Sequence, residues 1–338
     1  MSTPTVLVTG ATGGLGRNAV EYLLRRGLKV RATGRNEGIG AALQRAGADF
    51  HAEDLARRKF TQLEKLVHGV DAVWHCAALS SPWGAREDFM AANVRATEAI
   101  IHAAARNGVN HFVHISTPAL YFDFQHHRNI TEGYRPARYV NHYAETKALA
   151  EDLVQDCVKV FPKMNQVILR PRAIFGPHDQ VLVPRLSRIL HQTGGKLPLP
   201  RGGETVLDMT YVDNVVHAMW LATYGEPVPS GSVYNITNGE PEELRNVLQF
   251  LYLRQLGEPF AIRNVPYPVL ATAARAMEFA ACFTGKEPKL TRYSIGALAF
   301  DMTLDISKAR NELGYRPVIS LEDGVRRTAE WMKKSWQK

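Results

Sequence analysis

The chain has 338 residues, of which 45% are hydrophobic and 22% charged, and its formal net charge is +8. This length accommodates one large α/β domain with a smaller lobe, and the composition is that of an ordinary globular protein. Basic residues form only short pairs, so no nucleic-acid-binding stripe is predicted. The three cysteines and twelve histidines show no metal-ligand spacing, so no metal site is predicted. The N-terminal residues do not resemble a signal peptide, and we expect a cytoplasmic protein.

Short β-branched runs alternate with helical patterns in the first half of the chain. The expected strands cover residues 5–8, 29–33, 49–52, 72–76, 112–116 and 167–170. The expected helices between them cover residues 15–26, 40–46, 59–67, 89–107 and 143–161. Such alternation implies right-handed crossovers, and it predicts a Rossmann-type, doubly wound parallel sheet over residues 1–175.

From residue 176 onward this rhythm breaks, and Pro and Gly cluster at 198–203, 227–231 and 259–268. We expect a smaller substrate lobe over 176–338, partly interleaved with the sheet domain. The most apolar stretch, 265–283, contains Arg275 and Glu278 and is too polar to span a bilayer, which needs about 20 apolar residues. We expect it to be a core helix; a pocket lid and a helix on a membrane surface remain alternatives.

A glycine-rich turn follows the first expected strand. Gly10, Gly13 and Gly16 form GxxGxxG between a strand and a helix. Backbone can approach a pyrophosphate closely where side chains are absent, and the helix start offers free N–H groups. The turn therefore predicts a dinucleotide site, whose expected contacts also include Thr12, Gly14 and Leu15.

The end of the second strand predicts which dinucleotide is used. Gly34 and Arg35 stand where an NAD site usually has an acidic residue. At about 5 Å and an effective dielectric near ~20, a carboxylate would repel a 2′-phosphate by several kcal/mol, whereas Arg35 would attract it. NADPH is favoured over NAD. Arg31 either assists or is a plain surface arginine.

Two further segments are expected to line the dinucleotide site. Asp54 and Leu55 follow the third strand, where the aspartate would accept a hydrogen bond from adenine. Ala77 and Ala78 follow the fourth strand, where small residues let the chain pass close to the cofactor.

A tyrosine and a lysine share one helix face in YAETK. Tyr143 and Lys147 are one turn apart, so the cation is expected to lower a phenol pKa that is ordinarily near ~10. Thr117, at the carboxyl end of the fifth strand, is expected to bind the substrate oxygen, with Ser116 as the alternative. Tyr143 would then protonate a carbonyl that receives hydride from NADPH.

Candidates for substrate contacts are less specific. Arg172 is positioned to receive a carboxylate, although structural ion pairing is the commoner use of such an arginine. An apolar pocket is expected from Trp83, Phe122, Phe124, Leu270, Met277, Phe279 and Phe283. Asn93 either orders the Lys147 region or packs on a helix surface.

These motifs together resemble those of the extended short-chain dehydrogenase/reductases. The matching pieces are TGATGGLG, the pairs Asp54-Leu55, Ala77-Ala78 and Ser116-Thr117, and YAETK, LRPRAIFGP and TYVDN. The segments SPWG, LVPRL, LDMTYVDN and PKLTR are most similar to the 3β-hydroxysteroid dehydrogenase/isomerase branch, which contains bacterial NADPH-linked 2-alkyl-3-oxoalkanoate reductases. The resemblance implies that Pro171 and Ile174 lie near the nicotinamide. Tyr211, in TYVDN, is a further candidate for substrate contact.

The leading hypothesis is an NADPH-dependent reductase of a hydrophobic carbonyl compound, either a β-keto acid or a 3-keto or 3β-hydroxy sterol. A sugar-nucleotide epimerase or dehydratase with bound NAD is the first alternative. An NmrA-like protein that senses NADPH without chemistry is the second. We expect a homodimer built on the helices at 89–107 and 143–161, and at most a weak association with a membrane surface.

Overall fold

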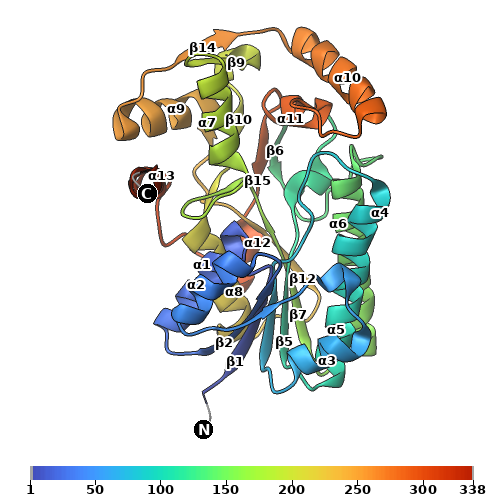
Figure 1. Cartoon of the computed structure of the whole chain (residues 1–338). Coiled ribbons are helices and arrows are strands. Elements are labelled where there is room, and N and C mark those ends of the chain that lie inside the picture. The colour runs from blue at the N-terminus through green and yellow to red at the C-terminus, as the bar shows by residue number, and fades with distance from the viewer. Residues whose placement is uncertain (1–2, 337–338) are drawn as a thin grey trace.

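Seven parallel strands form the central sheet, in the order β12-β7-β5-β4-β1-β2-β3 (Figure 1). The computed structural model describes residues 3–336. The strands are β1 Thr5–Thr9, β2 Lys29–Gly34, β3 Asp49–Ala52, β4 Ala72–His75, β5 His111–Ile115, β7 Asn165–Pro171 and β12 Ser232–Ile236. Their carboxyl ends meet at one edge of the sheet, where ligands bind in folds of this kind.

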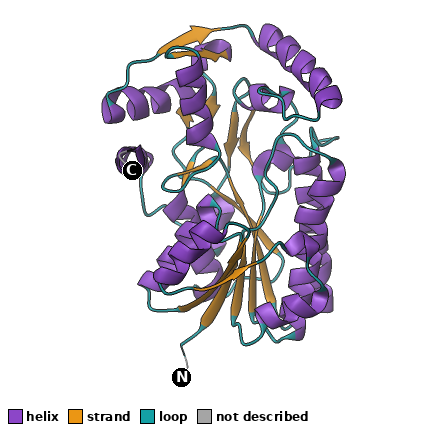
Figure 2. Ribbon diagram, in the orientation of Figure 1, coloured by secondary structure: helices purple, strands orange, loops and turns teal. Residues whose placement is uncertain are grey.

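Helices cover both faces of this sheet (Figure 2). One layer contains α1 Gly14–Arg25, α2 Glu37–Arg45, α8 Val212–Tyr224 and α12 Ser307–Glu312. The opposite layer contains α3 Phe60–Val67, α5 Ala96–Arg106 and α6 His142–Val160. Side chains alternate along each strand, so Val6 and Val8 pack into the first layer while Leu7 packs into the second. Burial on both faces explains the continuous apolar runs of the sequence.

The second half of the chain, joined by the segment that contains β6 from the first half, builds a lobe above the carboxyl edge of the sheet (Figure 1). Its strands are β6 His127–Ile130, β8 Ile174–Phe175, β9 Lys196–Leu199, β10 Val206–Leu207, β11 Thr210–Tyr211, β13 Glu242–Glu243, β14 Ala261–Asn264 and β15 Met302–Leu304. Its helices are α7 Leu182–Gln192, α9 Leu244–Leu248, η5 Gln249–Leu256, α10 Tyr267–Thr284, α11 Arg292–Ala297 and α13 Leu321–Trp336. Leucine and valine side chains from these elements form a separate apolar core.

The expected α/β architecture is confirmed, and all six expected strands are present. Three local features differ from the sequence-based expectation. The edge strand β12 comes from the second half of the chain and was not expected. The expected helix at 89–107 comprises α4 Arg86–Phe89, a wider π-helical segment at Met90–Arg95, and α5. Finally, α10 lies on the surface and is not a core helix.

Candidate active site

The glycine turn after β1 leaves no room for side chains. Gly10 has a φ of +65°, and a Cβ atom there would lie 2.8 Å from the backbone N and Cα of Ala77. A Cβ atom on Gly16 would overlap the carbonyl oxygen of Gly10. The N-cap residue of α1 is Gly13, which has no capping side chain, so the first-turn N–H groups are free to bind an anion. This backbone cradle fits the diphosphate of a dinucleotide.

A loop after β8 covers the start of α1. A Cβ atom on Gly14 would lie 2.9 Å from the carbonyl oxygen of His178, and Gln180 Nε2 donates a hydrogen bond of 3.1 Å to the Thr12 carbonyl. The His178 ring lies 3.2 Å from the Glu21 carboxylate and is not a freely exposed loop residue. The contacts of this loop with the glycine turn were not predicted from the sequence motifs.

The two arginines near the second strand have different environments. Arg35 follows β2 directly, is exposed, and forms no hydrogen bond or ion pair with another residue in the described range 3–336. Arg31 is held by Asp49 at 3.1 Å and by the carbonyls of Leu66 and His68, both at 2.9 Å. Arg35 is therefore the cation available to a ligand at the end of β2.

The segments that follow β3 and β4 lie where they were expected. Their side chains differ from one another in what they contact. The Asp54 carboxylate accepts a hydrogen bond of 3.2 Å from the backbone N–H of Ala56 and caps a short 3₁₀ turn, and Leu55 is buried in the core. Ala77 donates its backbone N–H to Thr9 Oγ1 at 3.2 Å, which draws this segment against the glycine turn. Ala78 is half-buried beside it.

Helix α6 brings Tyr143 and Lys147 to the end of β5. Asn141 caps this helix, its Oδ1 accepting from the Ala144 N–H at 2.8 Å. Lys147 Nζ donates a hydrogen bond of 2.7 Å to the carbonyl oxygen of Ile115, and Tyr143 has a hydrogen-bonding contact with the Thr117 side chain. The hydroxyl, phenol and amine predicted from the sequence thus lie together.

The pKa of Tyr143 differs from the expectation. Burial raises it to about 12, and the contact with Thr117 opposes this rise only in part. Lys147 does not lower the phenol pKa in this structure; burial instead lowers the pKa of Lys147 itself to about 8. Tyr143 therefore holds its proton firmly at neutral pH, as a proton donor must.

Two buried histidines lie beside Lys147, and sequence reasoning passed over both. His114 Nε2 is 3.0 Å from Lys147 Nζ, and the His114 ring stacks on His75 with centroids 5.5 Å apart. His75 contacts the hydroxyls of Thr9 at 2.8 Å and Thr97 at 3.0 Å. Burial, followed by the charge of Lys147, lowers the pKa of His75 to about 3 and that of His114 well below its usual value. Both rings are therefore neutral. The sequence feature that could have revealed them is the presence of a histidine inside each of two apolar strands.

Ser116 faces away from Thr117 and from the cleft. Its hydroxyl donates to the Glu151 carboxylate, which also accepts from Arg170 Nε at 2.8 Å in a buried ion pair. The alternative role of Ser116 in substrate binding is thus not supported. Asn93 links the segment after β4 to α6, with Oδ1 accepting from the Leu79 N–H at 2.7 Å.

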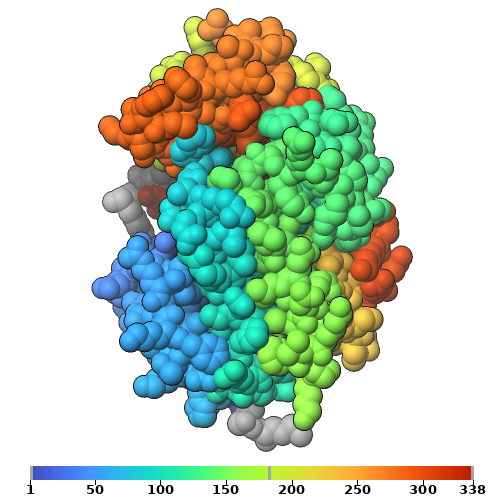
Figure 3. Space-filling view, turned by 90° about the vertical axis from the view of Figure 1, so that its right-hand side faces the viewer, coloured from blue at the N-terminus to red at the C-terminus, as the bar shows by residue number. Residues whose placement is uncertain are grey.

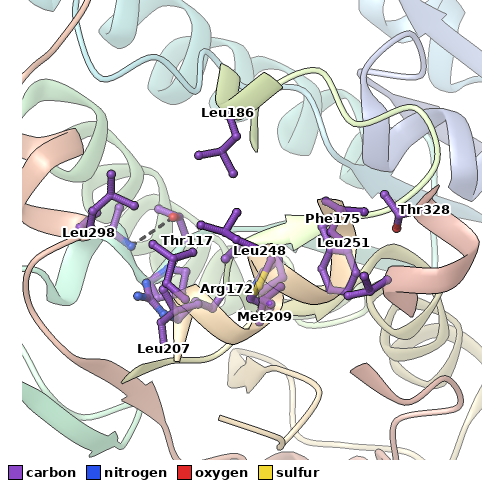
Figure 4. A pocket seen from close by; sticks show the side chains of 18 of the residues that line it. Thr117, Arg172, Phe175, Leu186, Leu207, Met209, Leu248, Leu251, Leu298 and Thr328 are labelled. Carbon is purple, nitrogen blue, oxygen red and sulfur yellow. Dashed lines mark hydrogen bonds between the residues drawn. The ribbon is translucent and has the colours of Figure 1, made fainter. Parts of the chain in front are cut away.

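An apolar cavity of about 220 Å³ opens beside Thr117 (Figure 4). Thr117, Pro171, Arg172 and Tyr293 form its polar end and the side nearest β7. The rest of its wall is mainly aliphatic and consists of Leu186, Leu207, Met209, Leu244, Val247, Leu248, Leu251, Leu298 and Val325, together with Phe175 and Thr328. Such a wall fits a hydrocarbon better than a polar group.

Arg172 is the cation of this cavity. Its Nε donates 3.0 Å to the carbonyl of Met302, and its remaining N–H groups have no acceptor among the residues that the structure describes. Burial lowers its pKa, and electrostatic interactions with Tyr293 and Asp208 oppose this shift. Ala173, the next residue, has an unusual φ of +43°, at the turn between β7 and β8.

Several expected pocket residues lie elsewhere. Of the described residues, those that line the cavity do not include Trp83, Tyr211, Phe122, Phe124, Leu270, Met277, Phe279 or Phe283. Tyr211 is buried against Gly324, and Ile174 is half-buried between two cores. Met277, Phe279 and Phe283 are exposed on α10. Aliphatic side chains from α7, α9 and η5 form the wall that these aromatic residues were expected to supply.

Comparison with known proteins identifies the family of the chain. Residues 6–237 match the model of the NAD dependent epimerase/dehydratase family, and the chain belongs to that family. It is therefore an NAD(P)-dependent enzyme of the extended short-chain dehydrogenase/reductase type, and the resemblance drawn from the sequence is confirmed.

Three individual proteins illustrate the similarity. The uncharacterized protein YbjS of Escherichia coli is 48% identical, with 97% of each chain covered. The 2-alkyl-3-oxoalkanoate reductase of Shewanella oneidensis is 31% identical, covering 95% of this chain and 84% of that protein. The crystal structure of UDP-glucuronic acid 4-epimerase from Bacillus cereus with NAD has a TM-score of 0.78 at 23% identity, covering 98% of this chain and 96% of that one.

No cluster of three or more His, Cys, Asp and Glu side chains among residues 3–336 is arranged to hold a metal ion. No helix in that range is both long and apolar enough to cross a bilayer.

Proposed function

We propose that the protein is an NADPH-dependent reductase of a hydrophobic carbonyl compound that carries a carboxylate. The observation that carries this proposal is the aliphatic cavity, which has at one end the Thr117 hydroxyl and the Arg172 guanidinium, a cation that forms no ion pair with another described residue. An alkyl chain of a β-keto acid, or the ring system of a keto sterol acid, matches the aliphatic wall. A 2-alkyl-3-oxoalkanoate is our leading substrate.

The residues that would hold the dinucleotide are those of the glycine turn and the ends of β2, β3, β4 and β7. The backbone from Gly10 to Gly16 would receive the diphosphate, and Arg35 would attract a 2′-phosphate. Asp54, Leu55, Ala77 and Ala78 would border the adenosine half; Pro171 and Ile174 would border the nicotinamide. When bound, NADPH supplies hydride.

Thr117 and Tyr143 would hold the substrate oxygen between two hydroxyls. Because burial raises the pKa of Tyr143 to about 12, the phenol stays protonated and can donate to an oxygen that gains negative charge. Lys147, fixed by the Ile115 carbonyl, keeps a cation one helical turn from this phenol. Its amine would also hydrogen-bond the nicotinamide ribose of the bound cofactor.

Arg172 would pair with the substrate carboxylate. A guanidinium binds a carboxylate through charge-assisted hydrogen bonds, which are strong where water is excluded. A β-keto acid places its carboxylate two bonds from the carbonyl carbon, so one ligand can engage Thr117 and Arg172 together.

A sugar-nucleotide epimerase remains the second candidate because the fold is shared with a UDP-glucuronic acid 4-epimerase. The cavity argues against it. A sugar and its nucleotide need many hydrogen-bonding partners, and most side chains of this wall are aliphatic. The cytoplasmic location and the homodimer remain predictions.

The test is a substrate panel with purified protein. We expect NADPH oxidation with long-chain 2-alkyl-3-oxoalkanoates, slower oxidation with neutral ketones of equal size, and none with UDP-sugars. Tyr143→Phe should bind NADPH as tightly as wild type, measured by fluorescence titration, and should lose at least about 10³-fold in kcat. Interconversion of UDP-sugars without net consumption of cofactor would replace this proposal by the epimerase.

A further inference from the structure

Helix α10 exposes an uninterrupted apolar face at the outer edge of the lobe. Phe279 is 69% exposed, Phe283 is 78% exposed and Val269 is 58% exposed. The two phenyl rings contact each other edge to face, with centroids 5.0 Å apart. Figure 3 shows the helix as the orange ridge along the top of the molecule. Single exposed apolar residues are common on protein surfaces, whereas three on the same side of one helix are unusual.

The outward face of this helix carries no charge, unlike that of an ordinary surface helix. Positions 269, 272, 276, 279, 280 and 283 lie on the outward face and are Val, Thr, Ala, Phe, Ala and Phe, without a charge. The acidic residue, Glu278, turns inward and pairs with Arg292 at 2.7 Å. Arg275, at the edge of the face, is the other charged residue within α10.

Exposed basic residues flank this helix in the sequence. Arg275 borders its apolar face, Lys286 and Lys289 follow the helix, and Arg263 on β14 precedes it, all of them exposed. One acidic neighbour, Glu287, forms no ion pair with another described residue. A ridge of phenyl rings with a cationic border complements the interface of a bilayer that contains anionic lipids.

The same helix packs against the wall of the cavity. Leu270 and Ala274 of α10 are buried and pack against Ile295 of α11. Tyr293 and Ala297, also on α11, line the apolar cavity. One side of this two-helix unit thus faces the substrate cavity, and its other side presents the phenylalanines.

We propose that α10 docks the protein on the surface of anionic membranes, with Phe279 and Phe283 inserted among the lipid chains. A convex ridge of one helix suits a deformable lipid phase, whereas a second copy of the chain would need a matching groove and about 800 Å² per partner for a stable interface. Docking would bring the mouth of an apolar cavity to the phase in which apolar substrates are dissolved. This inference concerns attachment and does not depend on the proposed reaction.

The test is co-sedimentation of the full chain with vesicles of phosphatidylcholine, with or without a minority of phosphatidylglycerol. We expect binding to the anionic vesicles and much weaker binding to the neutral ones. Phe279→Ser/Phe283→Ser should lower the partition coefficient at least about tenfold, because two apolar anchors are lost. Lys286→Glu/Lys289→Glu should lower it about tenfold on anionic vesicles only.

The controls remove exposed apolar side chains elsewhere. Leu253→Ser and Val318→Ser alter residues that are 43% and 54% exposed, and they should bind vesicles like wild type. Thermal melting checks that each variant is folded. Failure of wild type to bind anionic vesicles, or unchanged binding by the double phenylalanine variant, would overturn the proposal. So would light scattering that shows a dimer which this variant dissociates, because a second copy would then cover the face.

Discussion

Lys147 carries its amine in a place where a positive charge is poorly solvated. The side chain is 1% exposed, and its partners are a backbone carbonyl and a neutral histidine. Burial favours the uncharged amine, which is why its pKa falls to about 8. A residue so placed reduces stability, and the proposed role of Lys147 at the cofactor site would account for its presence.

The destabilising effect of the buried Lys147 amine should appear as a pH dependence of the free energy of unfolding, and replacement of Lys147 should remove it. The folded pKa of about 8 lies below the ordinary value of 10.5, so the unfolded chain binds more protons between these two pH values. The free energy of unfolding of wild type should therefore rise from pH 8 to 10.5, by up to about 3 kcal/mol at ~1.4 kcal/mol per pKa unit. In Lys147→Met this rise should be missing.

Urea unfolding of both proteins at pH 7 to 10.5 measures the effect. Lys159→Met, which alters an exposed lysine of the same helix, should retain the wild-type pH dependence. Parallel pH profiles for wild type and Lys147→Met would show that the buried amine is not the titrating group.

Arg35 should decide between the two nicotinamide cofactors. Arg35→Asp replaces a free cation by an anion where the 2′-phosphate is expected, and we expect NADPH affinity to fall about 100-fold or more. NADH affinity should change less than about threefold, because NADH lacks this phosphate. Fluorescence titration gives both dissociation constants. Arg45→Asp, an equal charge change on α2, is the control, and similar losses for both cofactors would remove Arg35 from the phosphate site.

At the scale of elements, the contact between the glycine turn and α1 leaves no space for one methyl group. A Cβ atom on Gly16 would overlap the Gly10 carbonyl and approach Ala11 Cα at 2.9 Å. Gly16→Ala must therefore push α1 away from β1, and we expect a loss of about 3 kcal/mol of stability and a melting temperature lower by several degrees. NADPH binding should weaken as well.

Gly133→Ala is the matched control, because a Cβ atom there meets nothing within 4 Å. It should melt like wild type and bind NADPH equally well. A Gly16→Ala protein that behaves in the same way would mean that the turn can relax, and that tight packing is not why glycine is present.

Element patterns in the sequence predicted the sheet well and the outer surfaces poorly. Buried parallel strands are continuous apolar runs, so the ends of the five strands beside β1 could be located to within two residues. Helix α10 is equally apolar, yet its face is exposed, because hydrophobicity alone does not say whether another element covers a face. Strand alternation could have predicted that Ser116 and Thr117 face opposite sides, since neighbouring residues of an extended chain do so.

Over the full chain, sequence motifs were more informative about the candidate reacting groups than about the cavity. Tyr143, Lys147 and the glycine turn belong to short local motifs, so spacing was sufficient to find them. The cavity wall combines residues from β7, α7, α9, η5 and α13, which tertiary packing alone brings together. His114 was missed for a related reason: its partner Lys147 is 33 residues away.

The sheet's outermost strand, β12, also affects how the protein is made. The chain leaves the sheet after β7, builds part of the lobe, and returns with α8 and β12 before it leaves again. A nascent chain on the ribosome cannot complete the sheet until residue 236 has emerged. Until then the outer edge of β7 has no neighbouring strand. Cutting the gene at the apparent border would therefore not yield two self-sufficient fragments, because each half needs the other to finish its own fold.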